Sequence, residues 1–167
     1  TQLQQLLGEE YEVRNFGYSG ATLLSKGHRP YINLDKYKAA LEFAPDIAVI
    51  HLGLNDTDPR NWPDHRDSFI PDYLALIDTL RTINPKVKIW VCRMTPIFHG
   101  HARFQSGTRD WHAQIQHAIE EVAYLSGAHL IDLHAPLYHR PDLFADALHP
   151  DAEGAMILAR TVYSALT

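Results

Sequence analysis

The sequence predicts an α/β domain in which a parallel sheet lies between two layers of helices. Short apolar runs, typical of strands buried on both faces, alternate along the chain with longer segments of helical periodicity. Few residues remain for linkers, and we find no internal repeat. Strands that alternate with helices predict parallel pairing, because each helix carries the chain back to the same end of the sheet.

Four segments are predicted to be strands: 11–16, 46–54, 87–94 and 128–133. The last three are continuous apolar runs, which is the pattern of strands covered on both faces. The first is shorter and ends at the glycine-containing turn GYSGAT. Cys92 lies inside the third run, so we predict a buried apolar side chain rather than a reactive thiol.

The segments between these runs have helical patterns. Apolar residues recur at three- and four-residue spacing over 67–83 and 108–125, and a shorter helix is predicted over 34–43. A last helix is predicted from Pro150, because acidic residues follow in its first turn, where the helix dipole favours negative charge.

The composition is that of one globular domain. Of the 167 residues, 46% are hydrophobic and 21% charged, and the net charge of −5 argues against nucleic acid as a partner. No apolar run reaches the roughly 20 residues of a membrane-spanning helix. Residues 1–10 resemble the last turns of a helix without its N-terminal cap. We therefore expect a single domain over 1–167 that is incomplete at its N-terminus.

Glycine and polar residues gather in three loops that follow predicted strands. The loops are 15–22 (NFGYSGAT), 53–62 (GLNDTDPRNW) and 146–150 (DALHP). Ligands of open α/β sheets bind outside the carboxyl ends of the strands. The three loops are therefore expected together at one edge of the sheet.

The residue types in these loops suit acyl transfer, which needs a base, a group that orients it and donors for the oxyanion. His149 is the candidate base, because imidazole titrates near neutral pH, and Asp146 is the candidate orienting partner. Asn55 is a candidate oxyanion donor through its side-chain amide. Gly20 is a second one through its backbone N–H, since glycine permits close approach. Asp56 is predicted to hold its loop.

The three loops resemble the SGNH (GDSL-like) hydrolase family of esterases, which is named for serine, glycine, asparagine and histidine in separate blocks. NFGYSGAT resembles the glycine block, HLGLNDT the asparagine block and DALHPDAEGA the histidine block, in the family's order. VRNFGYSGATLL and HLGLNDTDPRNWP are also similar to the esterase domain of sialate O-acetylesterase-like proteins. The resemblance covers the whole chain. It implies a flavodoxin-like fold and a Ser-His-Asp triad that needs neither a metal nor an organic cofactor.

The same resemblance implies that the nucleophile lies upstream of residue 1. In the family, the serine follows a first strand that lies between the strands resembled by 11–16 and 46–54. Both this strand and the serine are therefore expected outside the sequence. Ser19 is an alternative nucleophile, although its Gly-x-Ser-x-Gly elbow would need glycine where Ala21 stands.

The leading functional hypothesis is a serine esterase that removes a short acyl group, in particular acetyl, from a carbohydrate. The alternative is a non-catalytic carbohydrate-binding or interaction domain of the same fold that has lost its nucleophile. In that case Asp146 and His149 would only cap the last helix, and Asn55 would only form a turn. The resemblance also implies a periplasmic or secreted location, and it leaves room for further domains in a longer chain.

Five further loop residues are charged or aromatic and are expected near the same edge of the sheet. These candidate substrate contacts are Arg60, Trp62, Arg93, His99 and Arg103. Trp62 beside Arg60 would suit a sugar face next to a carboxylate or another polar group. His99 and His101 are too few ligands for a metal, and no metal site is predicted.

Overall fold

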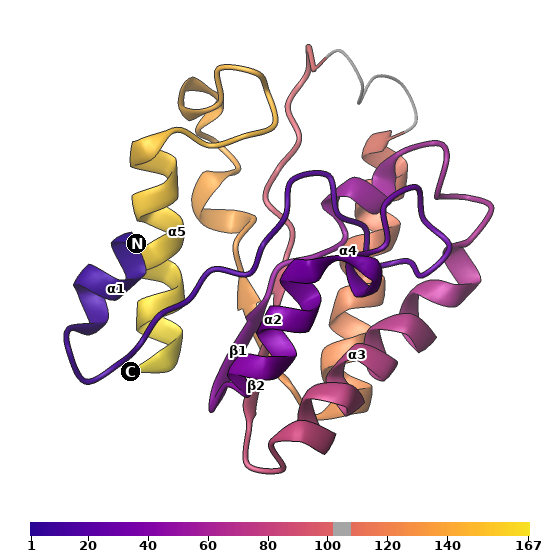
Figure 1. Cartoon of the computed structure of the whole chain (residues 1–167). Helices are drawn as coiled ribbons and strands as arrows, with labels where there is room; N and C mark the ends of the chain where they lie inside the picture. Colours follow the sequence, from indigo (N-terminus) through magenta and orange to yellow (C-terminus); the bar gives the residue numbers. More distant parts are fainter. Residues whose placement is uncertain (102–107) are drawn as a thin grey trace.

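The computed structural model of the protein describes residues 1–101 and 108–167 and has three layers (Figure 1). Within these residues, the middle layer is a sheet of β1 (Ile47–Ile50), β2 (Lys88–Arg93) and β3 (His129–Asp132). The strand order is β1-β2-β3 and both pairs are parallel. The predicted α/β/α architecture with a parallel sheet is confirmed.

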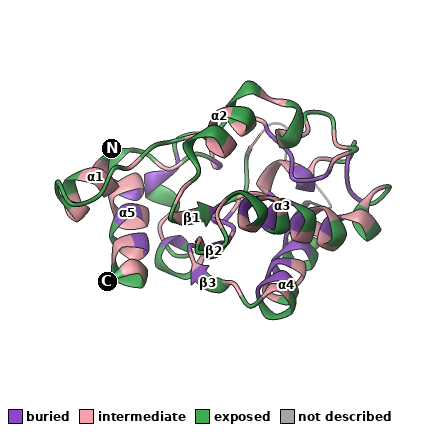
Figure 2. Ribbon diagram, turned by 60° about the horizontal axis from the view of Figure 1, so that its bottom comes forward, coloured by how far each residue is buried: buried purple, intermediate pink, exposed green. Residues whose placement is uncertain are grey.

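Helices cover both faces of the sheet (Figures 1 and 2). One layer contains α3 (Phe69–Ile83) and α4 (Thr108–Ser126), and the other contains α1 (Gln2–Leu7) and α5 (Ala152–Leu166). The shorter helix α2 (Asp35–Phe43) packs against the edge of the larger core.

The two cores follow from the alternation of side chains along the central strand. Ile89 and Val91 of β2 face the core formed with α3 and α4, whereas Trp90 and Cys92 face α5. Consecutive side chains of a strand point to opposite faces, so a strand covered on both sides is apolar throughout. Cys92 is fully buried, as predicted, and burial raises the pKa of its thiol to about 12.

The N-terminal segment differs from the prediction in two ways. Thr1 is the N-cap of α1, because its Oγ1 accepts a hydrogen bond from the Gln4 backbone N–H at 3.1 Å, so the cap expected to be missing is present. Residues 11–16 are extended but form no strand. The Gln4 side-chain amide instead binds the carbonyl of Tyr11 and the N–H of Val13, both at 2.7 Å. These bonds take the place of a strand ladder, since no described strand lies beside the segment.

A groove of about 440 Å³ lies between residues 11–17 and β1. Its walls come from both helix layers, with Leu3 and Leu7 of α1 on one side and Leu76 of α3 on the other. Among the described residues, β1 pairs with β2 along one edge and with nothing along the edge that faces the groove. Val49 is 37% exposed although it lies in the middle of the strand sequence. The sheet therefore presents an unpaired apolar edge.

Candidate active site

The loop before α5 holds Asp146 and His149 together. Oδ2 of Asp146 accepts a hydrogen bond from Nδ1 of His149 at 2.6 Å, and its Oδ1 accepts from the backbone N–H of His149 at 2.7 Å. Ala147 between them has φ 63, a left-handed conformation that turns the chain sharply. These hydrogen bonds, first of all the one from the imidazole, hold the pKa of Asp146 well below its usual range. Because a carboxylate can only accept, Nδ1 carries the proton and Nε2 is left able to accept one.

A different residue caps α5. Oδ1 of Asp151 accepts a hydrogen bond from the backbone N–H of Gly154 at 2.9 Å, which makes Asp151 the N-cap. The alternative that Asp146 and His149 only cap the last helix is therefore wrong. Their side chains are 50% and 67% exposed and are available to a ligand.

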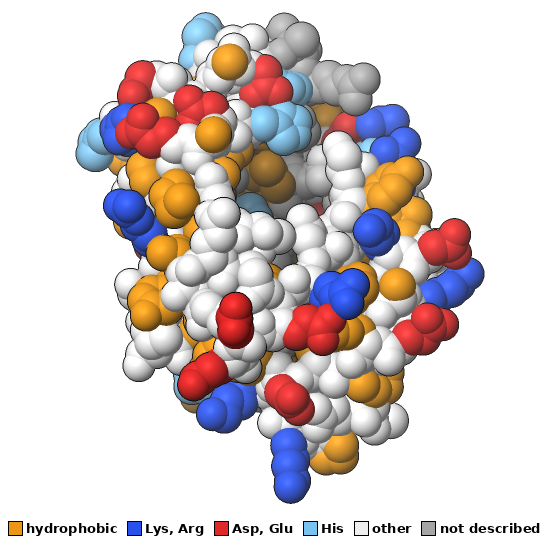
Figure 3. Space-filling model, turned by 60° about the vertical axis from the view of Figure 1, so that its left-hand side comes forward, with side chains coloured by type: hydrophobic (Ala, Val, Ile, Leu, Met, Phe, Trp, Pro, Cys, Tyr) orange, Lys and Arg blue, Asp and Glu red, His pale blue; other side chains and the backbone are white. Residues whose placement is uncertain are grey.

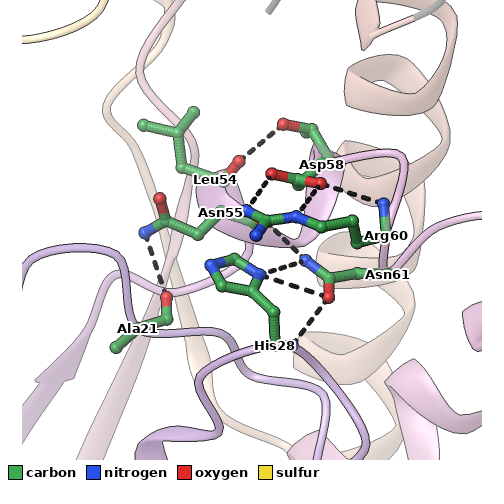
Figure 4. A network of polar contacts seen from close by, with 8 residues as sticks. Ala21, His28, Leu54, Asn55, Asp58, Arg60 and Asn61 are labelled. Atoms are coloured by element: carbon green, nitrogen blue, oxygen red, sulfur yellow. Dashed lines mark hydrogen bonds and ion pairs between the residues drawn. The ribbon is translucent and has the colours of Figure 1, made fainter. Parts of the chain in front are cut away.

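The glycine block forms a turn that is joined to the asparagine block (Figure 4). The backbone N–H of Ala21 donates to the Tyr18 carbonyl at 3.1 Å, and Gly20 has φ +78, which L side chains rarely adopt. Nδ2 of Asn55 donates to the carbonyl of Ala21 at 3.0 Å. Asn55 thus contacts the residue that follows Gly20 in the chain.

Two buried polar side chains hold these loops against each other. The carboxylate of Asp56 is fully buried and accepts hydrogen bonds from the backbone N–H groups of Leu23 and Leu24 at 2.9 and 2.8 Å. Burial raises the pKa of Asp56 to about 6, although these bonds oppose the shift. Asn61 is also fully buried, and its Nδ2 donates to the carbonyl of Asn55 at 2.9 Å. The predicted loop-holding role of Asp56 is confirmed.

The asparagine block follows the carboxyl end of β1, and the glycine block is joined to it by the hydrogen bond between Asn55 and Ala21. The N–H of Phe98, in the loop after β2, donates to the carbonyl of Ala147 at 2.9 Å. The N–H of Thr95, at the start of that loop, donates to Nε2 of His51 at 3.4 Å, just after β1. Figure 3 shows a hollow near the top of this face, with histidine and acidic side chains around it. A single substrate site shared by His149 and Asn55 stays a prediction.

Two of the candidate substrate contacts are engaged elsewhere. Trp62 is only 4% exposed, packs edge-on against Phe69 and donates from Nε1 to Gln114 at 2.9 Å. A sugar cannot stack on a ring inside the core, so this interpretation of Trp62 is wrong. Arg60 is exposed, but its guanidinium binds the carboxylate of Asp58 through two bonds of 2.7 and 2.9 Å. The hydrogen bonds from Arg60 lower the pKa of Asp58 to about 2. The guanidinium that would bind a substrate carboxylate is therefore already paired with Asp58.

The remaining candidates lie near the end of β2. Arg93 forms ion pairs with Asp132 of β3 at 2.7 Å and with Glu120 of α4 at 3.2 Å. It therefore links β2 to both of these elements. His99 is exposed in the loop that contacts the histidine block. Arg103 lies outside the described residues.

Residues 1–101 and 108–167 contain no group of three His, Cys, Asp or Glu side chains arranged to hold a metal ion. None of the described helices has both the length and the apolar character needed to cross a membrane.

Ser19 does not lie on a nucleophile elbow. An elbow places its serine between a strand and a helix. Here the preceding residues 11–18 form no strand, and the next helical element is a single 3-10 turn at Tyr31–Asn33. The alternative nucleophile therefore lacks the local structure that would activate it.

Sequence reasoning missed Asn61, His28 and Arg29. Asn61 accepts a hydrogen bond from the His28 backbone N–H at 2.9 Å, and the His28 ring stands beside the Asn55 segment (Figure 4). Arg29 follows directly and contacts the Gly20 turn. No spacing rule identifies these residues, because the residues they contact lie in other segments.

A comparison with family models assigns the chain. The model of the GDSL-like lipase/acylhydrolase family matches residues 1–157. The chain belongs to this family. The resemblance of its three blocks to SGNH (GDSL-like) hydrolases is confirmed.

Several proteins similar to this chain are named as esterases. An acetylxylan esterase of Xylanibacter ruminicola is 35% identical over 184 aligned residues, which cover 99% of this chain but 38% of the relative. The chain thus spans well under half of that protein. A putative arylesterase from Agrobacterium tumefaciens has a TM-score of 0.77 at 20% identity, over 99% of this chain and 83% of its own. An acetyl xylan esterase structure has a TM-score of 0.70 at 22% identity, over 90% and 79%. These two structures show the fold alone.

Proposed function

We propose that this domain carries the base, the orienting carboxylate and two oxyanion donors of a serine esterase that removes acetyl groups from a carbohydrate. The observation that carries the proposal is the hydrogen bond of 2.6 Å between Nδ1 of His149 and Oδ2 of Asp146. It leaves Nε2 of an exposed imidazole able to take a proton at the edge where Gly20 and Asn55 also lie.

The geometry suits the following reaction. Nε2 of His149 takes the proton of a serine hydroxyl as its oxygen attacks the ester carbonyl carbon. Asp146 stabilises the imidazolium that forms. The N–H of Gly20 and the second amide hydrogen of Asn55 donate to the oxyanion, since Ala21 occupies only one of the two hydrogens on Nδ2. Collapse of the intermediate releases the sugar hydroxyl, which receives the proton from His149. Water then hydrolyses the acyl-serine to acetate with the same base.

The serine is proposed to come from a strand that occupies the groove beside β1. The two segments on either side of the groove lead to the site. Residues 11–17 continue into the Gly20 turn, and β1 continues into the Asn55 loop. A parallel strand between them would deliver the residue after its carboxyl end between the two oxyanion donors. It would also pair the backbone N–H and C=O groups along the free edge of β1.

The carbohydrate substrate is supported by the relative named acetylxylan esterase, which shares 35% identity with this chain. The test uses the complete protein that contains this domain. Acetate release from acetylated xylan is measured, and a fluorophosphonate is used to label the nucleophile, which is then located by mass spectrometry. Hydrolysis together with a labelled serine outside residues 1–167 is expected.

Two results would contradict this proposal. A label on Ser19 would replace the proposed nucleophile. Absence of both label and hydrolysis, with retained binding to xylan, would favour the non-catalytic carbohydrate-binding domain.

A further inference from the structure

We propose that Arg29 is a positioning residue that holds the peptide group between Ser19 and Gly20 in the orientation needed for oxyanion stabilisation. The inference rests on the proposed esterase function, in which the N–H of Gly20 is an oxyanion donor. It concerns a residue that touches the peptide and not the substrate.

The turn at residues 18–21 has two alternative forms. The N–H of Ala21 binds the carbonyl of Tyr18, so Ser19 and Gly20 are its central residues. Gly20 has φ +78 and Ser19 is not among the residues of positive φ, which defines a type II turn. Types I and II differ by a flip of the central peptide, which here consists of the Ser19 carbonyl and the Gly20 N–H. The flip exchanges a donor for an acceptor at the surface where the oxyanion would form.

Arg29 binds the oxygen of this central peptide. Its Nη1 donates to the Ser19 carbonyl at 3.1 Å and lies 2.9 Å from the place where a Cβ on Gly20 would be. The guanidinium carbon lies 5.8 Å from the centre of the Tyr18 ring, within the range of a cation–π contact. The carbonyl and N–H of one peptide point in opposite directions. A cation fixed at the oxygen therefore selects one orientation of the turn and polarises the N–H on the other side.

Arg29 is itself held in place. The N–H of Thr22 donates to the carbonyl of Arg29 at 2.8 Å, and the N–H of Tyr31 donates back to Thr22 at 2.9 Å. Asn61 binds the backbone of the preceding residue, His28, at 2.9 Å. Within the described part of the chain no carboxylate forms an ion pair with Arg29, so its guanidinium is free to serve the peptide.

The kinetic test compares three variants of the complete protein on p-nitrophenyl acetate. Arg29→Met should lower kcat about tenfold with KM within about twofold, because an oxyanion donor acts in the transition state. Arg29→Lys retains a donor and should stay within about threefold of the wild type. Lys26→Met removes an exposed charge from the same loop and should leave kcat unchanged. An unchanged kcat in Arg29→Met, a rise in KM alone, or an equal loss in Arg29→Lys would each overturn the proposal.

A second readout does not depend on activity. In protein labelled with ¹⁵N-glycine, the amide resonance of Gly20 should shift in Arg29→Met and stay in place in Lys26→Met. An unmoved Gly20 resonance overturns the role of Arg29 whatever the activity. A wild-type protein without esterase activity overturns the proposed function instead, and the resonance still decides whether Arg29 sets the turn.

Discussion

The two halves of the candidate site are built in different ways. On the histidine side, the bond between Asp146 and His149 joins residues three positions apart within one loop. On the oxyanion side, the bond from Asn55 to Ala21 joins residues 34 positions apart. The further bonds that Asp56 accepts from the backbone N–H groups of Leu23 and Leu24 span 33 and 32 positions.

Because of this difference, substitutions on the two sides should affect the reaction and the folding free energy to different extents. The histidine pair is half-exposed and closed by local bonds, so its side chains can be removed with little effect on folding. The oxyanion side depends on a fully buried carboxylate and a fully buried amide, which also hold two loops together. Substitutions there should change the folding free energy as well as the reaction.

His149→Ala should show the largest effect and the purest chemical one. We expect kcat to fall by about 10⁴-fold or more, because the base of the triad is lost. The melting temperature should stay within about 2 °C, since the side chain is 67% exposed. Steady-state hydrolysis of p-nitrophenyl acetate and thermal unfolding measure the two effects. Unchanged turnover would end the assignment of His149 as the base.

Asn55→Ala should lower kcat by about 100- to 1,000-fold if its amide stabilises the oxyanion. The variant also loses the hydrogen bond to Ala21, which should lower the free energy of unfolding by about 1 kcal/mol. Asn84→Ala is the matched control, because Asn84 donates to the carbonyl of Pro45 at the same 3.0 Å but lies at the amino end of β2. The control should lose stability and keep kcat. Equal kcat losses in both variants would show that the effect of Asn55 is structural.

Asp56→Asn should change how stability depends on pH. The pKa of Asp56 is about 6 in the folded protein, above its ordinary value of 3.8, so the folded state binds the proton more tightly. Its contribution to stability is full below pH 3.8 and is lost as pH rises through 6. The stability of the wild type relative to the variant should therefore fall by about 2 kcal/mol between pH 4 and 7.

Urea unfolding at a series of pH values measures this difference. Asp78→Asn, on the exposed face of α3, corrects for the general effect of removing a negative charge. A difference between wild type and Asp56→Asn that is constant with pH would show that Asp56 does not titrate in this range.

Trp62→Phe should affect stability and leave the reaction unchanged. The ring is buried and its Nε1 bonds to Gln114, so we expect a loss of about 1–2 kcal/mol in the free energy of unfolding. Both kcat and KM on acetylated xylan should remain within about twofold. A clear rise in KM with unchanged stability would return Trp62 to the substrate site and place part of the sugar contact on this loop.

Features that depend on short-range pattern can be predicted from the sequence. Continuous apolar runs predict β1, β2 and β3, because these strands are covered on both faces, and helical periodicity predicts the helices that bury one face. The spacing of Asp146 and His149 predicts that their side chains form a pair, because the two residues are only three positions apart.

Features that depend on distant neighbours become visible only in the folded chain. Residues 11–16 have the composition of a strand, but a strand needs a partner for its backbone, and here the Gln4 side chain takes that place. Trp62 lies in a predicted loop, but its side chain is buried in the hydrophobic core. Arg29 carries no motif, and its relation to Gly20 exists because the loop folds back on itself. A hydrogen bond or a packed ring depends on what approaches from elsewhere in the chain, and local sequence does not contain that information.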